Sequence, residues 1–329
     1  MGQHDAPSRL VYYSIALPET APRPDLLWQL EASLRSLRTY NTTTPVALFV
    51  HGEMPSAVGA IASRYNAVVH IQEPYEARLA RLCPHGWRVL SRYPLLHKFL
   101  NFGELRTLPR PPRQVLFLDC DTLFFGDVDR LFARYENHDC VAREEASCRR
   151  SHLGYDPEYL DEGALDALAR AEGIRSVPPF NLGVVLFNGE CWWHLADLEE
   201  ALVSYAWRFA VWMACNPAAG LSASYGEGSG IELLRNGLVA LTSEDVAQAL
   251  PYPSANRWIL DEFALWLTLG NLPGLRTGDF WIGDVLQNGE FSARDRQAPD
   301  AILCHYFTQN MARIDAWMQQ QFVGSAHLA

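Results

Sequence analysis

The chain has 329 residues, of which 49% are apolar, and it carries a formal net charge of −11. This apolar fraction fills a sizeable core and excludes global disorder. The negative charge argues against a nucleic-acid-binding surface and against a polybasic membrane-binding tail. It still allows an anionic substrate, provided that a metal ion or local Lys and Arg side chains meet its phosphates.

The beginning of the sequence shows no charged segment followed by an apolar run, so we expect no secretory signal. No stretch approaches the ~18 uninterrupted apolar residues of a membrane-spanning helix, so we expect no transmembrane segment. The seven cysteines form no Cys-x-x-Cys pair and are typical of reduced thiols, which favours a cytoplasmic location. They are Cys83, Cys120, Cys140, Cys148, Cys191, Cys215 and Cys304.

Strand and helix patterns alternate through the first half of the chain. Apolar runs predict strands at Leu10–Leu17, Val46–Val50, Ala67–Ile71 and from Val115, and helical spacing predicts helices at Leu26–Leu37, Ala57–Tyr65 and Leu95–Leu105. Such alternation predicts an α/β fold with a doubly wound, mostly parallel central sheet flanked by helices.

The second half is less regular. Residues 143–179 are polar and charged, with one short helical piece at Leu165–Ala171, and form either an insertion or lid or a plain surface excursion. A strand is expected at Phe180–Asn188 and a Trp-rich helix at Leu195–Ala214. The glycine-rich stretch at 220–230 lacks the Gly-Lys-Ser/Thr ending of a phosphate-binding loop. We expect a single domain over residues 1–329 that carries one insertion.

The most informative segment is the run from Val115 to Phe125, in which an apolar strand ends in Asp119 and Asp121. Ligands of open α/β sheets bind outside the carboxyl ends of the strands. Residues i and i+2 of an extended segment point to the same side, so both carboxylates can reach one cation. Two such carboxylates repel each other unless a cation lies between them, which predicts Mg2+ or Mn2+ and, with it, a phosphate. An isolated Asp-x-Asp, however, is common by chance.

The segment VLFLDCDTLFFGDVDRLF resembles the metal-binding signature of nucleotide-sugar glycosyltransferases with the A-type (GT-A) fold. It is most similar to glycosyltransferase family 8, the glycogenin-like and galactinol-synthase-like enzymes. Four further segments resemble motifs of that family in the same order, and the resemblance spans roughly residues 10–315. They are Leu96–Phe99, Pro179–Asn188, Asp261–Leu265 and Cys304–Tyr306.

The resemblance implies a metal site for Mn2+ or Mg2+ made by Asp119, Asp121 and His305. His305 follows the apolar run from Ala301 to Cys304, so it also lies at a strand end; the plain alternative is a hydrogen-bonded core histidine. The resemblance further implies a nucleotide-binding half at about 8–135 and, at about 176–315, an acceptor half that contains the histidine.

The resemblance also implies donor-binding and catalytic residues. Lys98 would contact the donor, although an arbitrary lysine is more often a solvated surface residue. Asn181 would bind a sugar hydroxyl and belong with Asp261 to the catalytic residues, and Gly183 would line the donor site. Asn181 could instead be a buried amide bonded to the backbone. Asp261 and Glu262 begin a helix, where capping alone would explain carboxylates. By the resemblance we expect Asp261 to bind the acceptor or donor sugar near the reacting carbon, and Glu262 either to cap the helix or to support the residues that contact the ligand.

The function implied is metal-dependent transfer of a hexose from a nucleotide-diphosphate sugar, with UDP as the family expectation, to an unknown acceptor with retention of configuration. The expected acceptor is a sugar, a small molecule or a protein. Family members usually continue the histidine as H-x-x-G-x-x-K, with the lysine on the diphosphate. This chain has Thr308 and Met311 at the matching positions, and Arg313 lies two residues further on.

Three other functions compete with this one. A haloacid-dehalogenase-like phosphatase also places two aspartates after a strand, but as D-x-D-G-T, whereas Thr122 here follows Asp121 directly. A sugar-nucleotide-making nucleotidyltransferase shares fold and metal, but it has a Gly-rich, Arg-bearing loop after the first strand that this chain lacks. A non-catalytic sugar-binding relative is the third. Trp258 and Trp281 are the candidates for stacking against a sugar.

Overall fold

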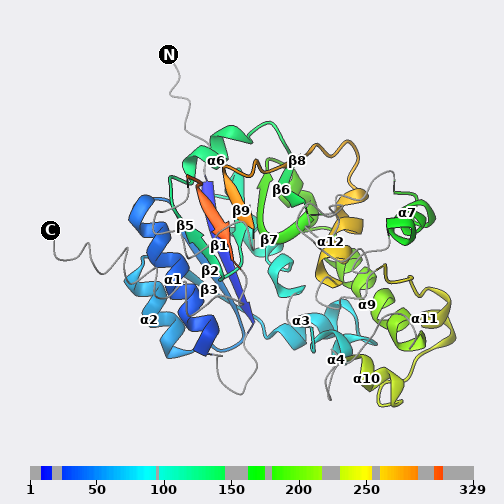
Figure 1. Ribbon diagram of the computed structural model, residues 1–329. Helices are drawn as coiled ribbons and strands as arrows, with labels where there is room; N and C mark the ends of the chain where they lie inside the picture. Colours follow the sequence, from blue (N-terminus) through cyan, green and yellow to red (C-terminus); the bar gives the residue numbers. More distant parts are fainter. Residues whose placement is uncertain are drawn as a thin grey trace.

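The computed structural model describes residues 9–16, 24–93, 96–144, 162–174, 180–216, 230–253, 260–287 and 300–306. Within these residues a seven-stranded sheet runs through the centre of the molecule, with helices on both faces (Figure 1). In spatial order its strands are β3 (Val68–Gln72), β2 (Val46–His51), β1 (Arg9–Ala16), β4 (Gln114–Leu118), β7 (Phe180–Asn188), β6 (Cys140–Glu144) and β8 (Thr277–Asp279).

The expected α/β fold with a mostly parallel central sheet is confirmed. Of the six neighbouring pairs among the described strands of this sheet, four are parallel, and only β7 runs antiparallel to its neighbours, β4 and β6. Strands β2, β4 and β7 are buried along their whole length, which explains why they read as continuous apolar runs. The carboxyl ends of β1, β2 and β4 and the amino end of β7 therefore meet at one edge.

Helices cover both faces of the sheet. The described helices are α1 (Pro24–Tyr40), α2 (Ser56–Arg64), α3 (Tyr75–Leu82), α4 (Trp87–Leu90), the 3₁₀ helix Leu96–Phe99, α5 (Phe102–Thr107), α6 (Asp129–Arg134), α7 (Glu162–Ala171), α8 (Cys191–Leu195), α9 (Glu199–Cys215), α10 (Gly230–Arg235), α11 (Ser243–Ala247) and α12 (Leu260–Gly270). Alternate residues of β1 face opposite sides. Val11 lies in a core with Leu30 of α1, and Tyr12 lies in a core with Phe263 of α12.

A second, smaller sheet lies beside the first and contains β5 (Thr122–Phe124), β10 (Leu303–His305) and β9 (Val285–Gln287), in that order. The chain leaves the large sheet at the end of β4 and enters the small sheet at β5, with only residues 119–121 between them. Strand β10 is antiparallel to β5 and parallel to β9. The Asp-Cys-Asp segment is therefore the junction between the two sheets.

Two expected helices differ from the structure. The helix predicted at Leu95–Leu105 is wrong: a 3₁₀ turn ends at Phe99 and α5 begins at Phe102, while residue 95 lies outside the described part. The break is explained by Asn101, whose side-chain amide donates to the carbonyl of His97 and to the Ser14 hydroxyl and so competes with helical hydrogen bonds. The helix predicted at Leu195–Ala214 corresponds to α9, which begins four residues later at Glu199, and Leu195 is the last residue of α8.

Several expected features lie outside the described residues. They are most of the 143–179 segment, the glycine-rich stretch up to residue 229, Trp258, Thr308, Met311 and Arg313. Within the 143–179 segment, α7 confirms the helix predicted at Leu165–Ala171. The expected halves at about 8–135 and 176–315 both contribute strands to the central sheet.

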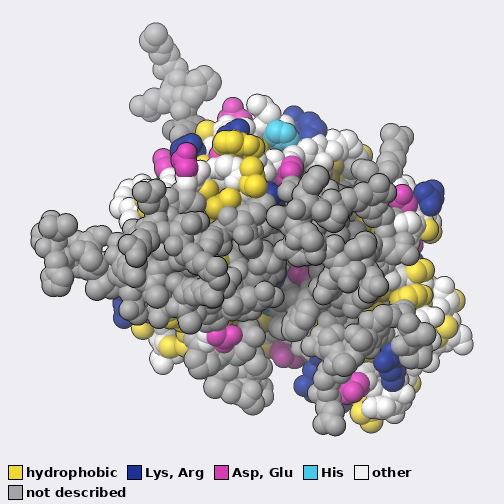
Figure 2. All heavy atoms as spheres, viewed as in Figure 1, with side chains coloured by type: hydrophobic (Ala, Val, Ile, Leu, Met, Phe, Trp, Pro, Cys, Tyr) yellow, Lys and Arg dark blue, Asp and Glu magenta, His cyan; other side chains and the backbone are white. Residues whose placement is uncertain are grey.

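Three features of the described residues bear on the expectations from composition: surface charge, helix hydropathy and the state of the cysteines. On the described part of the face shown in Figure 2, basic and acidic side chains are intermixed. Among the helices that the structure describes, none has the length and hydropathy of a membrane span. None of the six described cysteines forms a disulfide, and Cys148 lies outside the described residues.

Candidate metal and donor site

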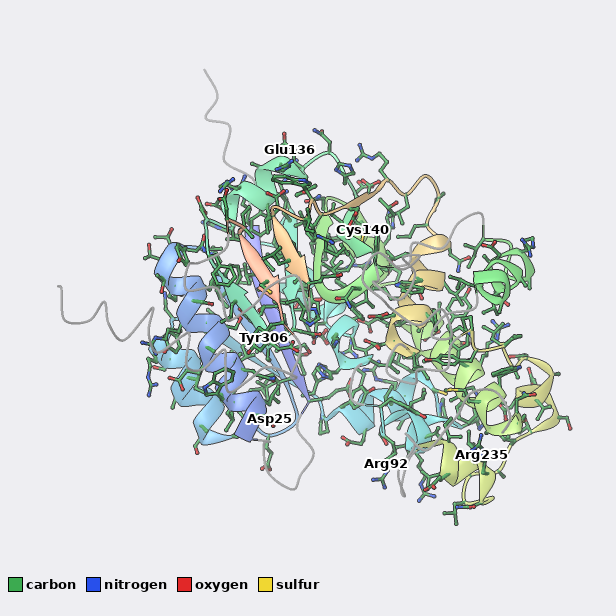
Figure 3. All side chains as sticks on the ribbon, viewed as in Figure 1. Asp25, Arg92, Glu136, Cys140, Arg235 and Tyr306 are labelled. Atoms are coloured by element: carbon green, nitrogen blue, oxygen red, sulfur yellow. The ribbon has the colours of Figure 1, made fainter. Side chains whose placement is uncertain are left out.

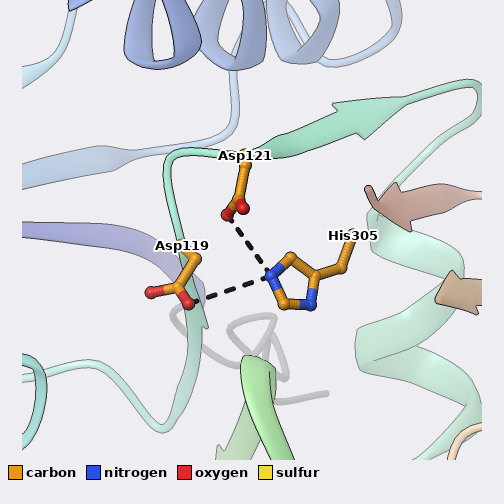
Figure 4. A group of neighbouring side chains, drawn as sticks. All are labelled: Asp119, Asp121 and His305. Atoms are coloured by element: carbon orange, nitrogen blue, oxygen red, sulfur yellow. Dashed lines mark ion pairs between the residues drawn. The ribbon is translucent and has the colours of Figure 1, made fainter. Parts of the chain in front are cut away.

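Three side chains meet at the junction of the two sheets. Asp119 directly follows β4, Asp121 directly precedes β5, and His305 is the last residue of β10. Nε2 of His305 lies 3.3 Å from Oδ1 of Asp121 and 3.9 Å from Oδ2 of Asp119 (Figure 4). The structure thus brings two neighbouring carboxylates together with an imidazole that lies more than 180 residues further along the chain.

Backbone hydrogen bonds hold this junction in place. The Asp119 N–H donates to the carbonyl of Gly183 in β7 over 2.8 Å, and the Tyr306 N–H donates to the carbonyl of Asp121 over 3.0 Å. In the small sheet, His305 pairs with Thr122. The two aspartates therefore belong to a bend between two strands rather than to one extended strand, and both carboxylates nonetheless face His305 (Figure 4).

The geometry fits a divalent cation. One ligand atom from each of Asp119, Asp121 and His305 lies within 4.8 Å of the other two. Ligands at about 2.0–2.2 Å from one ion are separated by roughly 3 to 4.4 Å, depending on the angle between them. Two carboxylates and one imidazole are ligands that suit Mn2+, and the oxygen ligands also suit Mg2+.

The electrostatics of the three groups show why a cation is favoured. Burial raises the pKa of the Asp119 carboxyl, and the negative charge of Asp121 raises it further against the opposing effect of Lys98. Burial acts in the same direction on Asp121, but His305 and Lys98 together outweigh it and lower the pKa of that carboxyl. Burial lowers the pKa of His305, and Asp121 and Asp119 together more than reverse this, so the net pKa is raised. The two carboxylates therefore favour a positively charged group beside them, either a protonated imidazole or a bound cation.

Lys98 is a buried part of this cluster and not a solvated surface lysine. Its Nζ lies 2.8 Å from Oδ2 of Asp119 and 3.7 Å from Oδ2 of Asp261, and its side chain is 9% exposed. Burial lowers the pKa of the ammonium, but Asp119 and then Asp261 raise it by more. Lys98 therefore lies, charged, between the carboxylate that follows β4 and the carboxylate at the start of α12.

Asp261 and Glu262 are both buried, at 3% and 7% exposure. Burial raises the pKa of Asp261 to about 6, with Lys98 acting in the opposite direction. Within the described part of the chain, Oδ1 of Asp261 makes no hydrogen bond. Helix capping alone does not explain a carboxylate that is buried in this way beside a lysine.

Asn181 and Gly183 lie on β7 beneath the histidine. Oδ1 of Asn181 is 3.1 Å from Nδ1 of His305 and accepts the Gly183 N–H, also over 3.1 Å. A Cβ atom added to Gly183 would lie 2.0–2.4 Å from three atoms of the His305 ring. Every residue that the sequence analysis assigned to the metal and the donor is therefore part of one contiguous cluster.

A neighbouring polar cluster went unrecognised in the sequence. Nδ1 of His97 lies 2.8 Å from Oγ of Ser14, which also accepts from Asn101 over 2.9 Å. The ring of His51 packs against that of His97 with centroids 5.7 Å apart. Ser14 and His51 are polar residues near the ends of two neighbouring parallel strands, a signal that the sequence did contain.

Trp281 does not lie in the site. It is 57% exposed, its ring stacks on Arg134, and its backbone N–H donates to the hydroxyl of Tyr135. Figure 3 shows Glu136, which follows Tyr135 in the chain, at the top of the molecule, whereas Tyr306, which follows His305, lies near the middle. The surroundings of Trp281 are therefore separate from the metal ligands. The expectation that Trp281 stacks against a sugar in this site is therefore wrong.

Comparisons with solved structures return glycosyltransferases. Mouse xyloside xylosyltransferase 1 in its apo form is 15% identical, with a TM-score of 0.45, over 92% of this chain and 98% of that one. The galactosyltransferase LgtC, in complex with donor and acceptor sugar analogs, is 10% identical, with a TM-score of 0.46, over 94% and 95%. The bifunctional glycosyltransferase WbbM is 10% identical, with a TM-score of 0.49, over 97% of this chain and 50% of that one.

No protein-family model matches the chain. No curated protein matches it either. With identities of 10–15% and TM-scores below 0.5, the three likenesses establish neither a family nor an activity for this chain.

Proposed function

We propose that this protein is a metal-dependent glycosyltransferase that transfers a hexose from a nucleotide-diphosphate sugar. The observation that supports this most directly is the cluster of Asp119, Asp121 and His305 at the carboxyl edge of a mostly parallel sheet, with Lys98 beside it. A partly buried acidic pair with a buried imidazole and an ammonium group is suited to a cation and a diphosphate together.

Transfer of the sugar requires that the negative charge on the leaving diphosphate be stabilised. Asp119, Asp121 and His305 would hold the metal ion, which supplies Lewis acidity when bound. Lys98 would add a second positive charge. Its ammonium is held by Asp119 and Asp261, so the charge is oriented before a ligand arrives.

Asp261 is the carboxylate that we propose lies near the reacting carbon. Its Oδ1, which has no hydrogen-bond partner among the described residues, is able to accept a hydrogen bond from a sugar hydroxyl, and Lys98 links Asp261 to the metal ligands. By resemblance we propose retention of configuration and UDP as the nucleotide. If the reaction instead inverts configuration, Asp261 or Glu262 would be the general base. The acceptor is a sugar, a small molecule or a protein.

The phosphatase alternative loses support from the position of Thr122. Its hydroxyl is fully buried, donates to the carbonyl of Asp119 over 3.0 Å, and lies 2.8 Å from the Ser33 hydroxyl. A threonine engaged in this way cannot bind a phosphate in the site.

The experiment is incubation of the protein with a panel of nucleotide-diphosphate sugars, beginning with UDP-glucose, together with Mn2+ and a set of acceptors. Metal-dependent release of UDP from the wild type, but not from Asp121→Ala, is expected. Absence of release with every donor and acceptor would refute the transferase, and phosphate release from sugar phosphates would favour the phosphatase. Formation of a sugar nucleotide and pyrophosphate from a nucleoside triphosphate would favour the nucleotidyltransferase. NMR of the product anomer decides between retention and inversion.

A further inference from the structure

We infer that Asn181 is a positioning residue that sets the tautomer and the orientation of His305. This inference rests on the proposed metal site and assigns Asn181 a role through the histidine rather than through the sugar. It follows from a short chain of hydrogen bonds in which the donors and acceptors are determined.

The backbone N–H of Gly183 can only donate, so the atom of Asn181 that it contacts at 3.1 Å must be the amide oxygen. The same oxygen lies 3.1 Å from Nδ1 of His305. An oxygen without a hydrogen can only accept, and therefore Nδ1 carries a proton that it donates to Asn181. Nε2, the other ring nitrogen, faces Asp121 at 3.3 Å.

A neutral imidazole with its proton on Nδ1 has its lone pair on Nε2. The hydrogen bond to Asn181 thus directs the metal-binding nitrogen toward the two carboxylates. Partners of this kind commonly orient a ligating histidine and tune its affinity for metal.

Steric contact with β7 also restricts the orientation of the His305 ring. Residues 181 and 183 of β7 point to the same face of the sheet, and the ring of His305 lies against Gly183 without room for a Cβ atom. One strand therefore supplies both an acceptor for Nδ1 and a flat surface for the ring. Asn181 is buried, at 6% exposure, so this hydrogen bond is shielded from water.

The first test needs no metal and no substrate. Long-range 1H–15N correlation spectra of histidine-labelled protein, recorded at a pH above the titration of His305, report which ring nitrogen carries the proton. The signal is assigned by its loss in His305→Ala. The measurement is made in an Asp121→Ala background, because the carboxylate of Asp121 also accepts a proton from Nε2 and favours the opposite tautomer. In that background the inference predicts the Nδ1–H tautomer with Asn181 and with Asn181→Asp, which keeps an acceptor oxygen, and a shift toward Nε2–H in the nearly isosteric Asn181→Leu. An Nε2–H tautomer with Asn181 in place would overturn the inference.

The second test measures Mn2+ binding by electron paramagnetic resonance. Asn181→Leu is expected to bind Mn2+ about 10- to 100-fold more weakly than the wild type, and Asn181→Asp at least as tightly as the wild type. In a His305→Ala background, Asn181→Leu should cause no further loss, because its effect passes through the ring. Equal Mn2+ affinity of the wild type and Asn181→Leu would refute the positioning role. So would a loss of Mn2+ affinity on Asn181→Leu that is as large in the His305→Ala background as in the wild type.

The proposed function and the inference about Asn181 can be refuted separately. If the wild type binds neither Mn2+ nor Mg2+, the proposed function fails, whereas the NMR experiment still decides the tautomer by itself. If the wild type binds Mn2+ and Asp121→Ala does not, the metal site stands, and the Asn181 variants test the inference alone. Thermal melting of each variant shows that the protein compared is folded.

Discussion

Replacement of Gly183 by alanine tests whether the contact between β7 and His305 determines the site. The added Cβ atom would lie 2.0 Å from Cε1, 2.2 Å from Nδ1 and 2.4 Å from Nε2 of the ring. Carbon atoms in contact lie about 3.5–4.0 Å apart, so the ring or the strand must move by roughly 1.5 Å. Overpacking of this kind typically costs about 1–3 kcal/mol, and a displaced ligand lowers metal affinity by about 10- to 100-fold.

The assay combines urea unfolding with Mn2+ titration. Gly126→Ala is the matched control, because the nearest described atom to its added Cβ, apart from its chain neighbours, would be the Ala301 carbonyl oxygen at 3.5 Å. This substitution should change the free energy of unfolding by less than about 1 kcal/mol. In a His305→Ala background the clash disappears, so Gly183→Ala should become neutral or slightly stabilising. If Gly183→Ala destabilises the protein equally with and without His305, or leaves the Mn2+ affinity of the wild type unchanged, the packing argument is wrong.

Three further predictions concern the cluster and its neighbours. Asp121→Ala should abolish metal-dependent donor binding, and calorimetry that shows unchanged affinity would count against the site. Lys98→Met leaves the partly buried carboxylate of Asp119 and the buried carboxylate of Asp261 without their ammonium partner and should lower the free energy of unfolding by about 3–5 kcal/mol. The same change should tighten Mn2+ binding, because the ion no longer competes with the lysine, and weaker Mn2+ binding would contradict this. Burial lowers the pKa of His51 to about 4, so its stabilising contribution is complete above the unfolded pKa of about 6.5 and is lost as pH falls toward 4. Urea unfolding should therefore show a loss between pH 7.5 and 4.5 that is about 2–3 kcal/mol larger in the wild type than in His51→Leu, in which the neighbouring His97, whose pKa burial also lowers, still titrates. An equal loss in both proteins would refute the assignment.

The sequence by itself determined the features that depend on local pattern. The apolar runs identified β1, β2, β4 and β7, because buried strands of a mostly parallel sheet read as uninterrupted hydrophobic segments. The same pattern placed Asp119 at the end of one strand and His305 at the end of another. Spacing and resemblance together selected Lys98, Asn181 and Asp261, which the structure then brought into one cluster.

Only the tertiary structure decided which of these side chains touch. The hydrogen bond between Asn181 and His305 joins residues 124 positions apart, and no local pattern encodes it. The break in the predicted helix at Leu95–Leu105 depends on the contact of Asn101 with Ser14, which is 87 residues away in the chain. The sequence suggested Trp281 as a site residue, but in the structure its backbone N–H donates to the hydroxyl of Tyr135, away from the metal ligands. Periodicity reports which residues are buried, but the partner of a buried polar group is determined by how distant strands pack against each other.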